Sequence, residues 1–243
     1  MDIEAINLTK RFGNRVALDN VSFRFSGPGA IGYLGPNGAG KTTTLKIFSH
    51  LLRPTYGKAL INGIDVADGY AKALESVSAL VETPEPYPKL SIKDFLTLIG
   101  GMRGLSREET TSRIAELKEK LSLEDLAVQG AKLSKGHKQR VALAATLMSD
   151  TDIMLLDEPT TGLDPAETYD VKKIIKELKR TRLVLMSSHL LDEVTELCDS
   201  VAFINKGRLL LTDTVKNVTN KFGKGKAGSA GLEDAYLKII KGG

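Results

Sequence analysis

The stretch GPNGAGKT, residues 35 to 42, decides the fold class of this chain. It matches the phosphate-binding pattern G-x-x-x-x-G-K-[ST], with the apolar segment AIGYL before it and KTTTLKIFSHLL, which has helical apolar spacing and stops at RPTYG, after it. This order of strand, glycine-rich turn and helix suits phosphate, because convergent backbone N–H groups and the positive end of a helix bind anions. The sequence therefore predicts a nucleoside triphosphate site in an α/β domain.

The residues of this loop have expected tasks. Lys41 is expected to bridge the outer phosphates, and the hydroxyl of Thr42 to ligate Mg2+. An overlapping G-x-G-x-x-G pattern precedes the apolar segment instead of following it, so it does not indicate a dinucleotide site. The candidate nucleotide-binding residues here are Gly35, Pro36, Asn37, Gly38, Ala39, Gly40, Lys41, Thr42 and Thr43.

Two carboxylates follow a buried apolar run in IMLLDEP, residues 153 to 159. The carboxyl ends of such strands form the edge at which ligands bind in α/β sheets. Asp157 suits a direct or indirect hold on Mg2+, and Glu158 is placed to polarise an attacking water. The simpler interpretation, two acids that cap a turn, leaves the phosphate loop without its partner.

Composition excludes several classes of protein. The 34 basic and 30 acidic residues give a net charge of +4, and the two signs are interspersed, so we expect no nucleic-acid partner. The one cysteine, Cys198, excludes an internal disulfide and fits a small buried apolar residue. No apolar run approaches the roughly 18 residues of a membrane span, and the N-terminus lacks a signal pattern, so the chain itself is expected to be soluble.

The order of the predicted elements supports an α/β fold. Residues 1–34 alternate short apolar runs with Gly and Asn, which indicates strands, and residues 91–149 indicate helices, since SIKD and SREE resemble capping boxes. TDIMLLDEP and TRLVLMSSH are typical of parallel strands, and the helix between them is predicted to be capped by Asp164. KFGKGKAGSAG, residues 221–231, is predicted to be a flexible linker before a last helix.

A second serine-and-glycine turn, LSKGHKQR, opens a basic helix at residues 133–140. Taken alone, it fits an N-capped surface helix. Together with GPNGAGKT, IMLLDEP, GLD and SSH, in this order and spacing, it makes nearly the whole chain resemble the ATP-binding subunit of ABC transporters. The resemblance implies a P-loop NTPase core, mostly parallel, with helices on both faces, an N-terminal antiparallel β-subdomain and an inserted helical subdomain. It implies one domain: a core of 1–90 plus 150–213, helices at 91–149, and a C-terminal linker and helix at 214–243.

The resemblance implies that two subunits meet head to tail. Ser134 and Gly136 would then contact the γ-phosphate held by the partner's phosphate loop, adding hydroxyl and backbone donors from the far side. Asp164 would lie at the seam between the subunits. His189 would contact the γ-phosphate and hold the attacking water and Glu158 in line.

The resemblance also implies an adenine pocket. Phe12 takes the position of an aromatic residue that stacks on the base, and Val16 would line the same pocket. The alternative for Phe12 is a plain core residue.

Two positions depart from the family pattern. Glu82 stands where a glutamine usually joins the Mg2+ site to the transmembrane partner, and an acid can ligate Mg2+ but cannot donate an amide hydrogen bond. In LSKGHKQR, which corresponds to the family's signature sequence, Lys135 and His137 replace the commoner glycine and glutamine. Lys135, and the C-terminal segment GLEDAYLKII, are similar to the exporter-like branch.

The leading hypothesis is an ATPase subunit that dimerises, with a second copy or a paralogous ATPase subunit, around Mg-ATP and drives export through a transmembrane permease subunit. Such a chain would be cytoplasmic and peripheral on the inner face of the cell membrane. One alternative is a soluble ABC-type ATPase that acts on nucleic acid or ribosomes. Another is a small-molecule kinase or GTPase, which has no use for LSKGHKQR.

Overall fold

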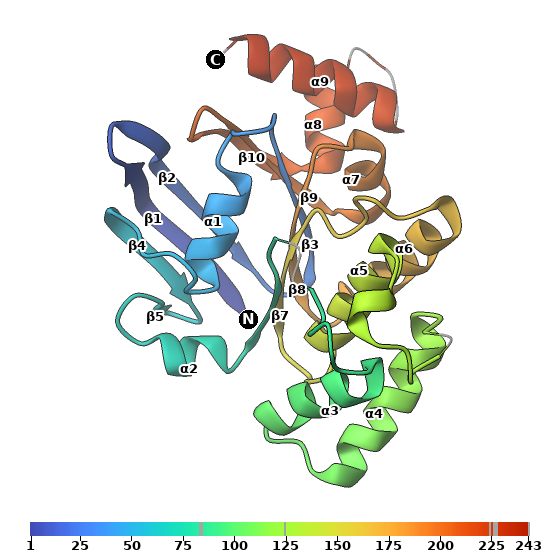
Figure 1. Cartoon of the computed structure of the whole chain (residues 1–243). Helices are drawn as coiled ribbons and strands as arrows, with labels where there is room; N and C mark the ends of the chain where they lie inside the picture. The colour runs from blue at the N-terminus through green and yellow to red at the C-terminus, as the bar shows by residue number, and fades with distance from the viewer. Residues whose placement is uncertain (83–84, 124, 224, 226–227, 243) are drawn as a thin grey trace.

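Two β-sheets enclose one helix, and most of the remaining helices lie on the other side of the larger sheet (Figure 1). The computed structural model describes residues 1–82, 85–123, 125–223, 225 and 228–242. The smaller sheet is antiparallel and the larger one is mostly parallel, so the predicted P-loop NTPase fold is confirmed.

The larger sheet has the strand order β10-β9-β3-β8-β7-β6. Its strands are β3 (Gly29–Leu34), β6 (Val77–Leu80), β7 (Ile153–Asp157), β8 (Leu183–Ser188), β9 (Ser200–Asn205) and β10 (Arg208–Thr214). All neighbouring pairs except β9 with β10 are parallel, and β7 and β8 are almost wholly buried. Leu34 pairs with Ser188 and Asp157 with Ser187, so the carboxyl ends of β3, β7 and β8 share one edge.

The smaller sheet has the order β2-β1-β4-β5, formed by β1 (Asp2–Phe12), β2 (Arg15–Ser26), β4 (Tyr56–Ile61) and β5 (Ile64–Asp65). Helix α1 (Lys41–Phe48) lies between the two sheets, where Leu45, Ile47 and Phe48 join a core cluster with residues of both. The predicted helix was expected to continue to Leu52. It ends at Phe48, and His50 adopts a left-handed conformation with φ of 57°.

The segment predicted as helical contains α3 (Ile92–Met102), α4 (Arg107–Lys120), a 3-10 turn η1 (Gly130–Lys132) and α5 (Lys135–Thr146). The short helix α2 (Tyr70–Leu74) precedes it. Ser106 makes both legs of its capping box with Glu109. Ser91 caps α3 by accepting from the backbone N–H of Asp94. These caps start the helices where the sequence predicts.

After β7, helix α6 (Pro165–Leu178) begins at the predicted cap, with Asp164 and Glu167 in a complete capping box. Helix α7 (Leu191–Leu197) follows β8. Helices α5, α6 and α7 bury apolar residues in one cluster with the parallel strands, including Val141, Ile175 and Val194.

The predicted flexible linker was wrong for much of its length. Helix α8 (Val215–Phe222) ends in it and α9 (Gly228–Gly242) begins in it, while residues 224, 226 and 227 lie outside the described residues. A Cβ on Gly223 would lie 2.9 Å from the Cα of Gly231, so glycine here permits a close crossing of the two helices. Val218, Leu232 and Ala235 are fully buried, and this packing stabilises both helices.

Candidate functional site

The phosphate loop, residues 35–42, connects the end of β3 to the first turn of α1. Gly40 has φ of 115°, and a Cβ there would lie 2.8 Å from the carbonyl oxygen of Ala17 and 2.7 Å from a methyl group of Leu18. Only glycine fits, because both the conformation and the space exclude a side chain. Strand β2 therefore packs directly against the loop.

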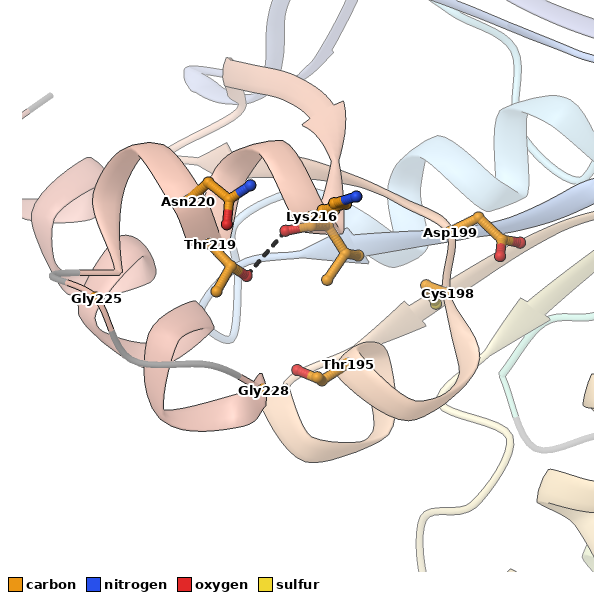
Figure 2. Close-up of a pocket in the computed structure, with 9 residues that line it drawn as sticks. Thr195, Cys198, Asp199, Lys216, Thr219, Asn220, Gly225 and Gly228 are labelled. Carbon is orange, nitrogen blue, oxygen red and sulfur yellow. Dashed lines mark hydrogen bonds between the residues drawn. The ribbon is translucent and has the colours of Figure 1, made fainter.

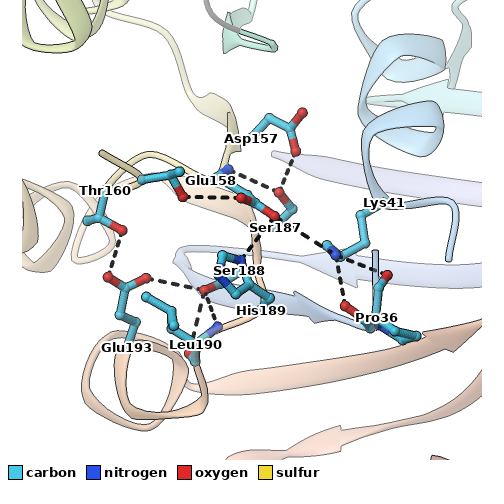
Figure 3. Close-up of polar contacts among 12 residues, drawn as sticks. Pro36, Lys41, Asp157, Glu158, Thr160, Ser187, Ser188, His189, Leu190 and Glu193 are labelled. Atoms are coloured by element: carbon cyan, nitrogen blue, oxygen red, sulfur yellow. Dashed lines mark hydrogen bonds and ion pairs between the residues drawn. The ribbon is translucent and has the colours of Figure 1, made fainter. Parts of the chain in front are cut away.

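Lys41 lies inside this loop with 6 % of its surface exposed. Its ammonium donates to the carbonyl oxygen of Gly35 at 2.8 Å and to that of Pro36 at 3.3 Å (Figure 3). Burial lowers the pKa of Lys41, and the nearby carboxylates of Glu158 and Asp157 oppose that shift. The loop thus holds a cationic group where phosphate would be bound.

The acid pair lies at the shared edge of the parallel strands. Asp157 accepts a hydrogen bond from the hydroxyl of Ser187 on the neighbouring strand. Glu158 has φ of 47°, a left-handed conformation that is uncommon outside glycine. Its N–H donates to the hydroxyl of Ser187 at 3.0 Å and to the carbonyl oxygen of Ser187 at 3.2 Å, which fixes this turn. The sequence interpretation did not identify Ser187, although a serine pair at the end of a buried apolar strand is an available signal.

The carboxylate of Glu158 has three neighbours. Its Oε1 lies 3.2 Å from Nδ1 of His189 and 4.0 Å from the Lys41 ammonium (Figure 3). Its Oε2 accepts from the hydroxyl of Thr161 at 3.1 Å. The structure therefore brings together the three residues, Lys41, Glu158 and His189, that the sequence analysis named as catalytic candidates.

A cleft of about 250 Å³ opens at this edge, and it is lined by Arg15, Ala17, Asn37, Gly38, Gly40, Lys41, Thr42, Thr43 and Glu158. Arg15 is a basic residue that the sequence interpretation missed. It faces the loop, since its guanidinium lies 3.8 Å from where a Cβ of Gly38 would stand.

The residues at the cleft fit Mg2+. Within the described residues no group of three or more His, Cys, Asp or Glu side chains could hold a metal, so a protein cage is excluded there. The Thr42 hydroxyl at the cleft and the Asp157 carboxylate are oxygen donors, and Mg2+ is usually held by one or two such groups together with substrate phosphates. Thr42 and Asp157 are the residues of this edge that would hold it, while the carboxylate of Glu82, the third candidate ligand, is paired with Lys46 in this structure.

The proposed adenine residues lie at the turn between β1 and β2. Phe12 pairs with Arg15 and Val16 with Arg11 across the hairpin. Phe12 is 50 % exposed, which excludes the alternative of a core residue, and the Lys10 ammonium lies 5.1 Å from the centre of its ring. An exposed aromatic face is what stacking on a base requires.

The signature turn is capped as predicted. Ser134 is exposed and its hydroxyl accepts from the N–H of His137 at 3.2 Å. Gly136 is buried, and a Cβ there would lie 2.2 Å from Oε2 of Glu167. The same carboxylate accepts from the N–H of Asp164 at 3.2 Å and pairs with Arg140 at 3.0 Å. Glu167 therefore ties the signature turn to the exposed Asp164 turn of the same chain.

Glu82 has φ of 64° and forms an ion pair with Lys46 on α1. Lys46 follows Thr42 by four residues, so both side chains lie on one face of this helix. The structure places the Glu82 side chain against α1, and residues 83 and 84 lie outside the described residues.

A larger cavity, of about 810 Å³, lies away from this edge between α7, α8 and the start of α9 (Figure 2). It is lined by Thr195, Cys198, Asp199, Val215, Lys216, Thr219, Asn220, Gly225 and Gly228. Cys198 is 7 % exposed, as predicted, and burial raises the pKa of its thiol. A buried, protonated thiol is a packing group rather than a nucleophile.

The fold and the phosphate loop define a P-loop nucleotide-binding protein. Residues 18–161 match the family described as ABC transporter. The chain is 37 % identical over 222 residues to the uncharacterized ABC transporter ATP-binding protein YhcH of Bacillus subtilis, covering 88 % of this chain and 70 % of that protein. The chain belongs to the ABC transporter family as an ATP-binding protein, and proteins of this kind are ATPases.

Two further comparisons agree. The chain is 33 % identical over 240 residues to the probable multidrug ABC transporter ATP-binding protein YbhF of Escherichia coli, covering 98 % of this chain but 41 % of that protein. A solved ATP-binding subunit of an ABC transporter superposes with a TM-score of 0.89 at 29 % identity, covering 98 % of this chain and 99 % of that one. These relatives are transporter components, which does not favour the nucleic-acid alternative. Among the described residues, no helix is both long and apolar enough to cross a bilayer.

Proposed function

We propose that this chain is the motor subunit of an exporter, in which two copies close around two Mg-ATP and part after hydrolysis. The observation that carries the proposal is the position of the Glu158 carboxylate, 3.2 Å from His189 and 4.0 Å from Lys41. A base, a histidine and a phosphate-binding lysine thus meet at one edge, as hydrolysis of a γ-phosphate requires.

Each residue has a task in this chemistry. Lys41 binds the outer phosphate oxygens, and the N–H groups of the loop bind the remainder. Glu158 accepts the proton of the attacking water, and His189 holds that carboxylate and the γ-phosphate in line. Thr42 and Asp157 would hold Mg2+, which would supply positive charge to the phosphate oxygens. Phe12 stacks on adenine, with Val16 beside it.

The second copy completes the site. Ser134 and Asp164 are exposed, although both cap helices whose positive ends favour anions. Ser134, with the backbone of Gly136, adds donors to the γ-phosphate bound by the other copy, and Asp164 lies at the seam. Loss of the γ-phosphate removes the group that both copies contact, so they separate.

The motion passes to a transmembrane permease subunit on the inner face of the membrane. The helices α3 to α5, and Glu82 in the segment before them, connect the site to that partner. Export is the direction we propose, because Lys135 is similar to the exporter-like branch and the E. coli relative is named a multidrug transporter component. Glu82, which would ligate Mg2+ after leaving Lys46, takes the place of the family's glutamine.

The test of this site is the rate of ATP hydrolysis by Glu158→Gln. Glutamine keeps the size of the side chain but cannot accept the proton, so kcat should fall roughly 10²- to 10⁴-fold while ATP still binds. Glu177→Gln, an exposed acid at the end of α6, is the matched control and should keep the wild-type rate. Wild-type turnover by Glu158→Gln would show that the base is another group.

A further inference from the structure

Glu193, in the first turn of α7, is a buried carboxylate to which the proposed mechanism gives no task. It is 4 % exposed. Burying a carboxylate is costly unless donors surround it. Its Oε1 accepts from the hydroxyl of Thr160 at 2.6 Å, and its Oε2 accepts from the hydroxyl of Ser188 at 3.2 Å (Figure 3).

These two hydroxyl groups belong to the two segments that carry the catalytic candidates. Thr160 follows Glu158 by two residues, and Ser188 immediately precedes His189. The Ser188 hydroxyl also accepts from the N–H of Leu190 at 3.0 Å, so the turn that contains His189 is fixed on both sides. Glu193 thus connects, through one side chain, the segment after β7 with the segment after β8.

The link extends to the signature helix. The side-chain amide of Gln139 on α5 donates to the carbonyl oxygen of Pro159 at 3.2 Å, and both groups are buried. Pro159 lies between Glu158 and Thr160. The segment after the base is therefore held from one side by α5 and from the other by Glu193.

We infer that Glu193 is a positioning residue for hydrolysis, which keeps His189 within reach of the Glu158 carboxylate by bridging the hydroxyl groups of Thr160 and Ser188. The inference rests on the proposed roles of Glu158 and His189. It assigns to Glu193 an effect on kcat, because the phosphate loop and Phe12, which bind ATP, are not among its contacts.

A purely structural explanation is that Glu193 stabilises α7, since an acid in the first turn of a helix interacts favourably with its dipole. Asp192 occupies the same turn but is exposed, and it is the matched control for this effect. The two explanations differ in which variants lower kcat and in what happens at His189.

The experiment compares Glu193→Ala, Glu193→Gln and Asp192→Ala by ATPase kinetics and by NMR of the histidine rings. Glu193→Ala should lower kcat about 10- to 100-fold, because a shift of about 1 Å in a catalytic group has an effect of this size. KM for ATP should change less than about twofold, since binding is made elsewhere. Glu193→Gln should stay within about threefold of wild type, because its oxygen accepts from Thr160 and its amide donates to Ser188.

The NMR readout is independent of turnover. The chain has 3 histidines. The ring signals that disappear in His189→Gln are those of His189. Glu193→Ala should move the His189 signals and leave those of His50 and His137 in place, while Glu193→Gln and Asp192→Ala should move none. If Glu193→Ala fails to fold, Ser188→Ala and Thr160→Val each remove one arm of the bridge and should give smaller changes of the same kind.

Wild-type kcat and unmoved His189 signals in Glu193→Ala would overturn the inference. If Glu193→Ala does not fold, the same result in both Ser188→Ala and Thr160→Val would overturn it. Equal loss of kcat in Asp192→Ala would overturn it in favour of the structural explanation. If the His189 signals move while Glu158→Gln hydrolyses ATP normally, the positioning stands and the proposed catalytic roles fail.

Discussion

Glu158 adopts a backbone conformation that few residues other than glycine adopt, with φ of 47°. Two hydrogen bonds from its N–H to Ser187 hold it there. Strained backbone of this kind persists where the surroundings fix it, and it occurs often at functional sites. The conformation aims the Glu158 side chain toward His189 and the Lys41 ammonium instead of continuing the line of β7.

Some residues of the candidate site could be predicted from the sequence and others could not. Lys41, Asp157 and Glu158 could be predicted because each stands in a motif whose chemistry needs that residue type. Arg15 and Glu193 could not, because their importance depends on which segments lie side by side, and the serine pair that contains Ser187 marks a strand end without showing which residue it contacts. A serine or an acid in an apolar run has no meaning until its neighbour across the sheet is known.

At Phe12 we expect an effect on nucleotide affinity alone. Stacking on a base contributes about 1 to 3 kcal/mol, so Phe12→Ala should raise KM for ATP roughly 5- to 150-fold. kcat at saturating ATP should stay near wild type, since the residues that contact the Glu158 carboxylate, Lys41, Thr161 and His189, are unchanged. Phe12→Tyr keeps the ring and should match wild type. An unchanged KM in Phe12→Ala would mean that adenine binds elsewhere.

At the scale of the element, capping chemistry located the helices well. Ser91, Ser106, Ser134 and Asp164 all cap the helices that the sequence assigned to them, because each cap is a local hydrogen bond within three residues. Helix α8 was missed although Thr214 caps it by accepting from the N–H of Asn217, and packing against α9 stabilises it further. Glycine composition there was misinterpreted as flexibility, although Gly223 and Gly231 serve a close helix crossing.

Helices α6 and α7 are joined at the surface by Glu196. It forms ion pairs with Lys172 at 2.9 Å and Lys176 at 2.6 Å, and hydrogen bonds from Lys176 and Lys172 lower the pKa of Glu196 below its ordinary value of 4.5. A carboxylate whose pKa is lower in the folded than in the unfolded state stabilises the fold at every pH above its unfolded-state pKa. This stability is lost as the pH falls through the folded-state pKa.

Glu196→Gln should therefore lower the free energy of unfolding at pH 7 by less than about 1 kcal/mol, because the pair is exposed and screened. The difference from wild type should disappear below the lowered pKa of Glu196, where the wild-type carboxyl is also neutral. Urea unfolding at neutral and acid pH measures both values. A difference that persisted unchanged in acid would assign the effect to packing instead of charge.

At the scale of the whole molecule, the fold class and the parallel core of the larger sheet followed from the phosphate loop and two apolar runs. These features succeed because parallel strands buried on both faces need continuous apolar sequence. The antiparallel sheet was anticipated only through the family resemblance, since register shifts within β1 interrupt the alternation that β2 keeps from Val21 to Ser26.

The molecule carries two turns that each open a helix, the phosphate loop before α1 and the Ser134 turn before α5. The phosphate loop opens into a cleft with Glu158, while Ser134 and Asp164 lie on an exposed surface tied together by Glu167. In the proposal, this surface contacts the γ-phosphate of an ATP that is bound by another copy. The proposal therefore requires a second copy.

The most direct test of this requirement is the mass of Glu158→Gln in solution, measured by light scattering or sedimentation over a range of protein concentrations with saturating Mg-ATP. The proposal predicts that ATP doubles the mass, that ADP does not, and that adding Ser134→Arg to the same chain abolishes the doubling. A mass that remained that of one chain at every concentration, with ATP bound, would contradict it.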